Sequence, residues 1–178
     1  MRIVAIYNIH LVDKNYHHKQ NLGFVNFFHR SSVQALLDEF ALHAASKLQN
    51  PERKIYEHSD FQFLCYRYGE NACILITDLE YPSRVSFDLL NHAMHQDSSE
   101  KYLEYVVEQC QNPCTIDRLT KVQHQLDETL VIMHENVNRV LERGDSIDKL
   151  VEKSERLSQS SKMFYKVARK HNRCCHIQ

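Results

Sequence analysis

The chain has 178 residues, 43% of them hydrophobic, which is enough for one domain of medium size with a true core plus an appendage. Its 22 Lys and Arg residues balance its 23 Asp and Glu residues and leave a formal net charge of −1. Because such a chain has no overall attraction for nucleic acid, we expect no nucleic-acid partner.

The N-terminal region predicts two strands. Residues 2–12 are β-branched and apolar, which is typical of a buried strand. No small-residue cleavage site follows them, so they are not interpreted as a signal peptide. Residues 13–21 are polar and predict a turn, and the alternation along residues 23–28 predicts a second strand.

A helix is expected next, at about residues 33–48, because its apolar positions share one face. Ser31 or Ser32 is the expected N-cap, since a serine hydroxyl accepts a hydrogen bond from the first turn of a helix. The helix is expected to end before Asn50-Pro51, because proline disfavours helical backbone at the residue before it.

Three extended segments follow the helix, at residues 54–57, 61–68 and 73–77. The short connection around Gly69 predicts that the last two pair as a hairpin. Two helices come after them. The first begins near Pro82 and runs to about residue 96, and the second covers about residues 100–110.

This order of elements predicts an α+β domain. A five-stranded antiparallel sheet with one helix on one face and two on the other would bury all the apolar stripes. The stretches PhePheHisArgSerSerValGln at 27–34 and GluTyrProSerArgValSerPhe at 80–87 are similar to the longin domain, a profilin-like fold at the N-terminus of certain R-SNAREs. The resemblance implies the same sheet and a domain over residues 1–111.

No catalytic or metal constellation is recognisable. The three glycines cannot make a phosphate-cradling loop, and the motifs GxSxG and HExxH are absent, so we expect no enzyme and no cofactor. Cys65 and Cys73 lie in apolar runs and are expected to be buried, reduced thiols. The spacing of Cys110 and Cys114 lacks companion ligands, and the histidine pair at 17–18 is read as an exposed loop.

The last third of the chain carries an apolar repeat of period 3.5. Between residues 119 and 171, alternating strides of three and four meet mostly apolar or small side chains, while the residues between them are mostly polar. Such a narrow repeat is typical of a helix wrapped by other helices. We call these positions the seam: Leu119, Val122, Leu126, Thr129, Met133, Asn136, Val140, Arg143, Ile147, Leu150, Ser154, Leu157, Ser161, Phe164, Ala168 and His171.

One seam position, Arg143, is charged. A buried and unpaired guanidinium would cost several kcal/mol, so partner helices have to offer acceptors at the same level. The periodicity alone leaves two alternatives open: a plain coiled-coil dimer whose arginine reaches out to water, and a mixed bundle in which Arg143 is paired.

The letters around Arg143 resemble the SNARE motif of an R-SNARE of the synaptobrevin-like class. The matching runs are LeuAspGluThr at 126–129, ValLeuGluArgGly at 140–144 and SerLysMetPheTyrLys at 161–166. The resemblance implies one long helix over residues 119–171, preceded by a linker at 112–118. It also implies that Arg143 meets three glutamines from three Q-SNARE helices in a parallel four-helix bundle.

The last seven residues, 172–178, resemble a lipidation signal. Cys175-His176-Ile177-Gln178 fits the C-a-a-X pattern, and a final glutamine favours farnesyl on Cys175. Cys174 is the natural site for a palmitoyl or second prenyl group, since one lipid alone anchors only marginally. No apolar stretch approaches the roughly 20 residues that a spanning helix needs. The membrane attachment is therefore expected to be a lipid anchor.

The family resemblance implies a fusion protein that is cytoplasmic and cycles to the cytosolic face of Golgi, endosomal, vacuolar or vesicle membranes, with ER-to-Golgi transport among its routes. Without partners, the exposed seam is expected to be covered by the chain's own longin domain in a closed form. The alternative function is a longin-type scaffold that binds a small GTPase or a coat, with a coiled-coil tail for oligomerisation.

Overall fold

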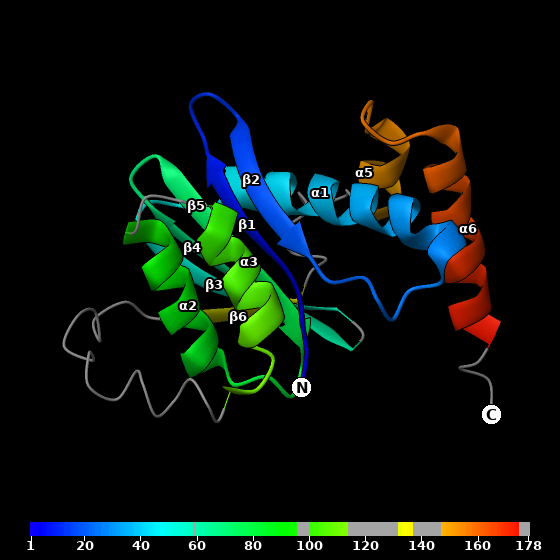
Figure 1. The fold of residues 1–178 in the computed structure, drawn as a ribbon. Coiled ribbons are helices and arrows are strands. Elements are labelled where there is room, and N and C mark those ends of the chain that lie inside the picture. The colour runs from blue at the N-terminus through cyan, green and yellow to red at the C-terminus, as the bar shows by residue number, and fades with distance from the viewer. Residues whose placement is uncertain (59, 96–99, 114–131, 137–146, 175–178) are drawn as a thin grey trace.

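The structure, a computed structural model, describes residues 1–58, 60–95, 100–113, 132–136 and 147–174. Within these residues six strands form a single sheet in the order β2-β1-β5-β4-β3-β6 (Figure 1). The pairs among β1 to β5 are all antiparallel, whereas β6 joins β3 in parallel. The strands are β1 (Ile3–His10), β2 (Asn15–Gln20), β3 (Glu52–His58), β4 (Phe61–Tyr68), β5 (Asn71–Asp78) and β6 (Ile132–Asn136).

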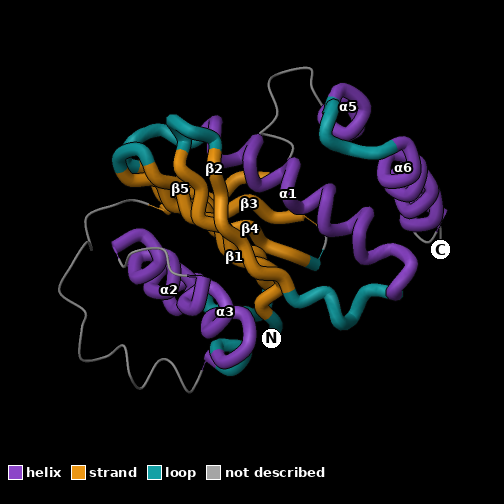
Figure 2. The backbone as a smooth tube through the Cα atoms, turned by 45° about the horizontal axis from the view of Figure 1, so that its top comes forward, coloured by secondary structure: helices purple, strands orange, loops and turns teal. Residues whose placement is uncertain are grey.

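Helices cover both faces of the sheet, as predicted. Figure 2 shows α1 on one face and α2 and α3 on the other, with α5 and α6 forming a further layer outside α1. This arrangement confirms the predicted fold, with β1 to β5 as five antiparallel strands, one helix on one face and two on the other, and β6 is a sixth, parallel strand that was not predicted. The helical elements are η1 (Phe27–His29), α1 (Arg30–Lys47), α2 (Ser83–His95), α3 (Glu100–Gln109), α5 (Ile147–Lys153) and α6 (Gln159–Cys174).

Each face of the sheet has its own apolar core, because alternate residues of a strand point to opposite sides. Ile6, Leu64 and Leu75 pack with α2 and α3, and all three are fully buried. Tyr7 and Ile74, on the other face, pack with Ala41 and other alanines of α1. The small side chains of α1 let its backbone lie close to the sheet, so this layer is thin and leaves the outer face of α1 available to α6.

Two predictions for the N-terminal region are wrong. Residues 13–21 are not simply a turn, because Asn15–Gln20 form β2 and pair with β1 from Ala5↔Gln20 to His10↔Asn15. Residues 23–28 are not a strand but an irregular segment that ends in η1. β2 is an edge strand that buries little side-chain surface, so its residues can be mostly polar.

The start of α1 also differs from the prediction. The helix begins at Arg30, directly after η1, and the residue at its N-cap position, His29, makes no side-chain capping bond. The cap belongs instead to η1, where the Asn26 side chain accepts from the backbone N–H of Phe28 at 3.1 Å. Ser32, expected as a cap, is a buried residue within the helix. The predicted N-cap was therefore several residues too late.

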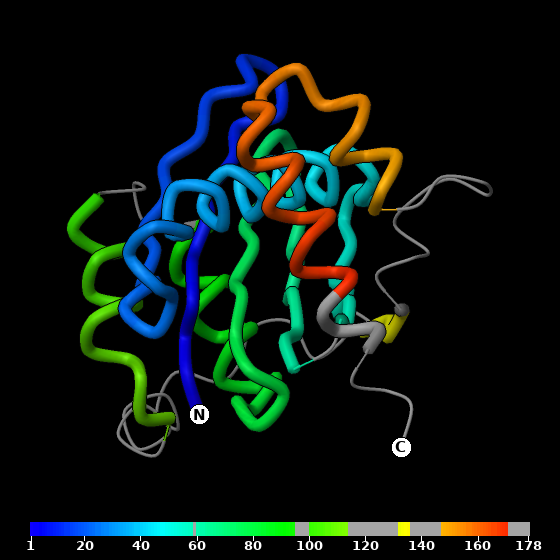
Figure 3. The backbone as a smooth tube through the Cα atoms, turned by 90° about the vertical axis from the view of Figure 1, so that its right-hand side faces the viewer, coloured from blue at the N-terminus to red at the C-terminus, as the bar shows by residue number. Residues whose placement is uncertain are grey.

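The predicted long helix over residues 119–171 is not continuous in the isolated chain. Residues Ile132–Asn136 form β6, and α5 and α6 are separated by a break at residues 154–158. Figure 3 shows α6 crossing over α1, with β6 at the edge of the sheet. The same residues cannot be a strand and part of a helix at once. The chain without partners therefore holds a different conformation from the one that a helical bundle requires.

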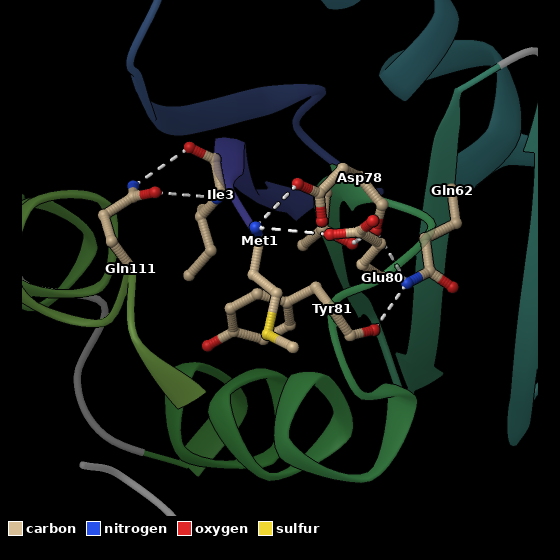
Figure 4. Close-up of polar contacts among 8 residues, drawn as sticks. Met1, Ile3, Gln62, Asp78, Glu80, Tyr81 and Gln111 are labelled. Carbon is tan, nitrogen blue, oxygen red and sulfur yellow. Dashed lines mark hydrogen bonds and ion pairs between the residues drawn. The ribbon is translucent and has the colours of Figure 1, made fainter. Parts of the chain in front are cut away.

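A polar network fastens the N-terminus to the end of α3 (Figure 4). The Gln111 side chain accepts from the Ile3 N–H at 3.0 Å and donates to the Ile3 carbonyl at 3.0 Å. The Tyr81 hydroxyl donates to the Cys110 carbonyl at 2.8 Å. The N-terminal ammonium lies 3.3 Å from the carboxylate of Asp78. These bonds tie β1, β5 and α3 together at the point where the chain leaves toward the linker.

Candidate functional site

The part of the seam that the structure describes lies mostly against the longin-like sheet and helix. α6 packs on α1, and α5 packs on α6 (Figures 1 and 3). From residue 147 to 168 the seam positions are all buried or half-buried: Ile147, Leu150, Ser154, Leu157, Ser161, Phe164 and Ala168. Most residues between them are exposed or charged. The face that would enter a helical bundle is thus the face that the folded domain now covers.

Specific contacts fix this position of α6. The hydroxyl of Ser161 lies 3.4 Å from the hydroxyl of Ser32 in α1, and both serines are buried. The ring of Phe164 stacks on His29, with centroids 4.6 Å apart and planes at 27°. Ile147 packs against the core between α1 and the sheet. Three seam residues therefore contact α1, the turn before it or the core beneath it.

The buried apolar surface of α5 and α6 is small. In this layer, residues 147–174, the buried apolar side chains among the described residues are Val151 and Leu157, which are 3% and 5% exposed. Full burial of such a side chain contributes roughly 1.5–3 kcal/mol before the cost of ordering the chain. We therefore expect a layer with so few fully buried apolar side chains to be displaced readily by a competing partner.

The break between α5 and α6 has its own local chemistry. The Ser158 hydroxyl accepts from the backbone N–H of Ser161 at 3.1 Å, which is the bond of an N-cap. The Ser154 hydroxyl accepts from the N–H of Arg156 at 3.3 Å and closes the preceding turn. Because the 3.5 period continues through residues 154–158, it gave no indication of this break in the helix. The serines at 154, 158, 160 and 161 favour caps and turns, so they could have predicted a helix end here.

The two helices of this layer are also joined by charge. Lys162 donates to the Glu152 carbonyl at 2.8 Å, and Lys166 lies 3.8 Å from the Glu152 carboxylate. Arg169 forms an ion pair with Asp148. These groups are largely exposed, and such pairs contribute little individually. They align α5 with α6 but do not bind the pair to the domain.

β6 is held by backbone bonds more than by side-chain burial. Its register on β3 runs from Arg53↔Ile132 to Glu57↔Asn136. Ile132 and the seam residue Met133 are 36% and 40% exposed. The β-branched letters near residues 131–132 favour a strand, and an unpaired β3 edge favours any segment that can cover it. Met133 is therefore the described seam position that the domain leaves most open.

Several predicted site residues lie outside the described residues: Leu119, Val122, Leu126, Val140, Arg143 and Cys175. Their roles stay predictions. Cys174 is the last residue of α6, so the predicted second lipid site directly ends a described helix. The structure brings Ile147, Leu150, Leu157 and Phe164 to the layer on α1 and separates them from Met133 in β6.

The described side chains offer no reactive centre. Cys65 and Cys73 are buried as predicted, and burial raises the pKa of Cys73 to about 12. Burial also raises the pKa of Cys65 and Cys110, which disfavours the thiolate that a nucleophile needs. Among the described residues no three His, Cys, Asp or Glu side chains gather to hold a metal ion.

A hollow of about 650 Å³ lies between β2, the start of α1 and α3. Its lining includes Lys19, Arg30, Glu104 and Glu108, and Lys19 lies 3.5 Å from Glu104. Paired charges of both signs do not favour an alkyl chain or a single anion. The hollow is therefore not a candidate for an apolar groove that could hold a lipid chain.

Comparison with known proteins decides the family. Residues 118–178 match the synaptobrevin family, and residues 23–112 match the longin family, described as a regulated-SNARE-like domain. The chain is 37% identical over 177 residues to the synaptobrevin homolog YKT6 of Saccharomyces cerevisiae, covering 89% of this chain and 88% of that protein. The chain belongs to the longin-bearing synaptobrevin family. Two further relatives of this family agree in length and extent.

The VAMP-like protein YKT61 of Arabidopsis thaliana is 34% identical over 173 residues, covering 88% of this chain and 87% of that protein. The synaptobrevin homolog ykt6 of Schizosaccharomyces pombe is 31% identical over 173 residues, covering 88% of each. Longin-bearing synaptobrevins are R-SNAREs, which act in vesicle fusion through other SNARE helices and are not enzymes. Within the described part of this chain, no helix has both the length and the apolar character needed to cross a bilayer.

Proposed function

We propose that this longin R-SNARE zippers its seam segment with three glutamine-bearing SNARE helices into a parallel four-helix bundle. Arg143 is the central layer, and Leu119, Val122, Leu126, Met133, Val140, Ile147, Leu150, Leu157 and Phe164 are packing layers around it. Zippering proceeds from the linker toward the C-terminal end of the segment. Burial of the seam supplies the free energy that draws two bilayers together.

The observation that carries the proposal is the inward orientation of the seam from residue 147 to 168. Over this range seam side chains are covered and most intervening ones are exposed, even though a turn at residues 154–158 breaks the segment. A pattern that persists across this turn belongs to the sequence, and it is the pattern that a bundle of helices needs.

The domain also has a regulatory role in the proposed function. With its own seam docked on α1, the protein is in a closed form that partners have to displace. The small buried apolar area of α5 and α6 supports a closed form that opens reversibly. For a protein that is competent only when open, the apparent affinity for partners falls by the open fraction. The longin domain then sets the rate at which fusion complexes assemble.

The central layer is tested by Arg143→Leu. The variant is expected to keep a helical bundle but to lose the selection of glutamine-bearing partners. A leucine side chain has no donor, so it makes no hydrogen bond to glutamine acceptors in that layer. Arg139→Leu removes the same charge one turn earlier, off the seam, and serves as the matched control. Pull-down with a mixture of partner helices, followed by a lipid-mixing assay, measures both effects. Equal partner choice and equal fusion rate for Arg143→Leu and the unmodified chain would contradict the central-layer role.

The membrane anchor is the second part of the proposal. Cys175 carries a farnesyl group and Cys174 a palmitoyl or second prenyl group, so the protein cycles between cytoplasm and the cytosolic face of Golgi, endosomal, vacuolar or vesicle membranes. Two lipids anchor stably, whereas one binds marginally and exchanges. Fractionation of cells should find Cys175→Ser entirely off membranes and Cys174→Ser in a weakly bound pool. A Cys175→Ser protein that stays fully on membranes would place the anchor elsewhere.

A further inference from the structure

Two adjacent phenylalanines stand out on the surface. Phe28 is 83% exposed and Phe27 is 75% exposed, the highest values for large apolar side chains among the described residues. Their rings meet edge to face, with centroids 5.9 Å apart. Leaving two aromatic rings in water forgoes the stabilisation that burial would give. Such a pair calls for a partner that is absent when the chain is alone.

The exposure is built into the backbone. We call residues 21–30 the Phe turn. Arg30 donates from Nε to the Val25 carbonyl at 3.0 Å and from its guanidinium to the Gly23 carbonyl at 3.4 Å. Asn26 accepts from the Phe28 N–H at 3.1 Å, and its carbonyl accepts from the His29 N–H at 2.9 Å. These bonds hold the two rings outward, so their position is specified and not a result of a loose loop.

The Phe turn lies beside the basic helix α6. The stack of His29 on Phe164 places the end of the turn against that helix. α6 carries five Lys or Arg residues and no Asp or Glu. It also exposes Met163 by 65% and Val167 by 49%, next to the exposed Lys166 and Lys170. An outer helix face of apolar and basic side chains is typical of a helix that lies in a membrane interface.

Positive charge persists after local pairing. Residues 147–174 contain eight Lys or Arg against three Asp or Glu, so the ion pairs between α5 and α6 leave an excess of cations. The Arg2 guanidinium lies 4.4 Å from the centre of the Phe24 ring in the Phe turn. At the same end of the sheet, Asp78 and Glu80 both face the N-terminal ammonium, at 3.3 and 3.7 Å (Figure 4). These two carboxylates are thus partly neutralised.

We propose that the Phe turn inserts Phe27 and Phe28 into the interface of an anionic bilayer, while the basic outer face of α6 contacts the lipid headgroups. The site is a surface of the folded, docked chain and needs no lipid on Cys174 or Cys175. It orients the molecule so that the C-terminal end of α6, where the proposed anchor begins, is held close to the bilayer. The inference therefore goes beyond the proposed anchor, and its test leaves lipidation and partners out.

The chain contains no tryptophan, so one introduced indole reports a single position. The test uses the full-length chain with Cys174→Ser and Cys175→Ser, mixed with vesicles of phosphatidylcholine and phosphatidylserine. Phe28→Trp should show a blue-shifted emission on vesicle addition, because the indole leaves water. Tyr68→Trp is the matched control. Tyr68 is 54% exposed and is the last residue of β4, and the emission of an indole there should not shift on vesicle addition. An unshifted Phe28→Trp in the presence of bound protein overturns the proposal.

Partition is measured in the same system by flotation. Phe27→Ser with Phe28→Ser should reduce vesicle binding by roughly tenfold or more, since two apolar side chains are lost from the interface. Tyr68→Ser with Val12→Ser, two exposed apolar positions that belong to neither the Phe turn nor α6, should change vesicle binding by less than about twofold. Unchanged binding of the double Phe variant means that charge alone acts, and it overturns the proposal. A blue shift that grows with protein concentration without vesicles assigns the rings to a second copy of the chain, and it overturns the proposal too.

Discussion

At the scale of single residues, the buried hydroxyl of Tyr7 organises a polar cluster between β1, β2 and α1. It donates to the Asp38 carboxylate at 2.8 Å and accepts from the Gln20 amide at 2.6 Å. Gln20 also donates to Asp38 at 2.8 Å. Burial, reinforced by the Asp38 charge, raises the pKa of Tyr7, so the hydroxyl stays a donor. The cluster anchors α1, on which the seam docks.

Tyr7→Phe removes the donor but leaves the Asp38 carboxylate in place. We expect a loss of about 1.5–3 kcal/mol in the free energy of unfolding, the range for a lost hydrogen bond to a charged group, since Asp38 keeps only its bond from Gln20 within the cluster. Denaturant unfolding measures it. Tyr68→Phe deletes a hydroxyl on a half-exposed side chain and should cost much less. Equal losses for both variants would mean that the cluster does not contribute to the stability of the domain.

The buried thiols give a prediction that depends on pH. Alkylating reagents attack the thiolate, and burial raises the pKa of Cys73 to about 12. Because a raised pKa keeps the thiol protonated as pH rises, Cys73 should stay unlabelled in the folded chain even at about pH 9, where an ordinary cysteine is largely ionised. Mass spectrometry after labelling with and without denaturant checks this. Fast labelling of Cys73 in the folded chain would contradict the buried position.

At the scale of elements, sequence patterns predicted what is strongly periodic or apolar. The strand at residues 61–68, with its buried Leu64 and Cys65, has the predicted bounds. β2 was missed because an edge strand buries little, and its letters AsnTyrHisHisLysGln carry no alternation of apolar residues. The pairing that makes it a strand comes from β1, which is a tertiary contact that local letters do not contain.

The seam segment shows the opposite failure. Its 3.5 period predicted a helix through Met133, yet those residues form β6 because the β3 edge offers backbone partners and no bundle is present. The 3.5 period predicts the helix that the segment forms in a bundle with partner helices. The structure shows the conformation of the same segment when no partner is present. The candidate seam residues could thus be predicted, but their present positions could not. The exposure of Phe27 and Phe28 was equally invisible, since a strand was expected there.

Docking of α5 and α6 is expected to depend on Leu157. Leu157→Asp places a charge at a position that is 5% exposed, so the cost of burial exceeds the roughly 2–5 kcal/mol of a large apolar deletion. α5 and α6 should detach from α1, while the two apolar cores on the faces of the sheet stay folded. Hydrogen exchange should then speed up in residues 147–174 and on the outer face of α1. Met163→Asp, at a 65% exposed position in the same layer, is the control and should leave exchange unchanged.

At the scale of the whole molecule, opening converts one set of backbone bonds into another. Residues 132–136 have to leave the sheet, and the break at 154–158 has to become helical, before one helix can run through the segment. Mixing the chain with glutamine-bearing partner helices should therefore raise helical circular dichroism above the sum of the separate components. The increase should be slower than association of a seam peptide without the domain. Equal rates for both would mean that the domain does not restrain the segment.

The parallel strand β6 has a consequence for the domain that it leaves behind. Once residues 132–136 join a bundle, the backbone donors and acceptors of β3 on that side are open to any other extended chain. β3 carries Glu52, Arg53, Lys54 and Glu57 along its length, and such charges discourage intermolecular strand addition. Each round of opening and reclosure thus passes through a state in which the β3 edge is free to pair with another chain. The charged residues of β3 protect this open state against aggregation.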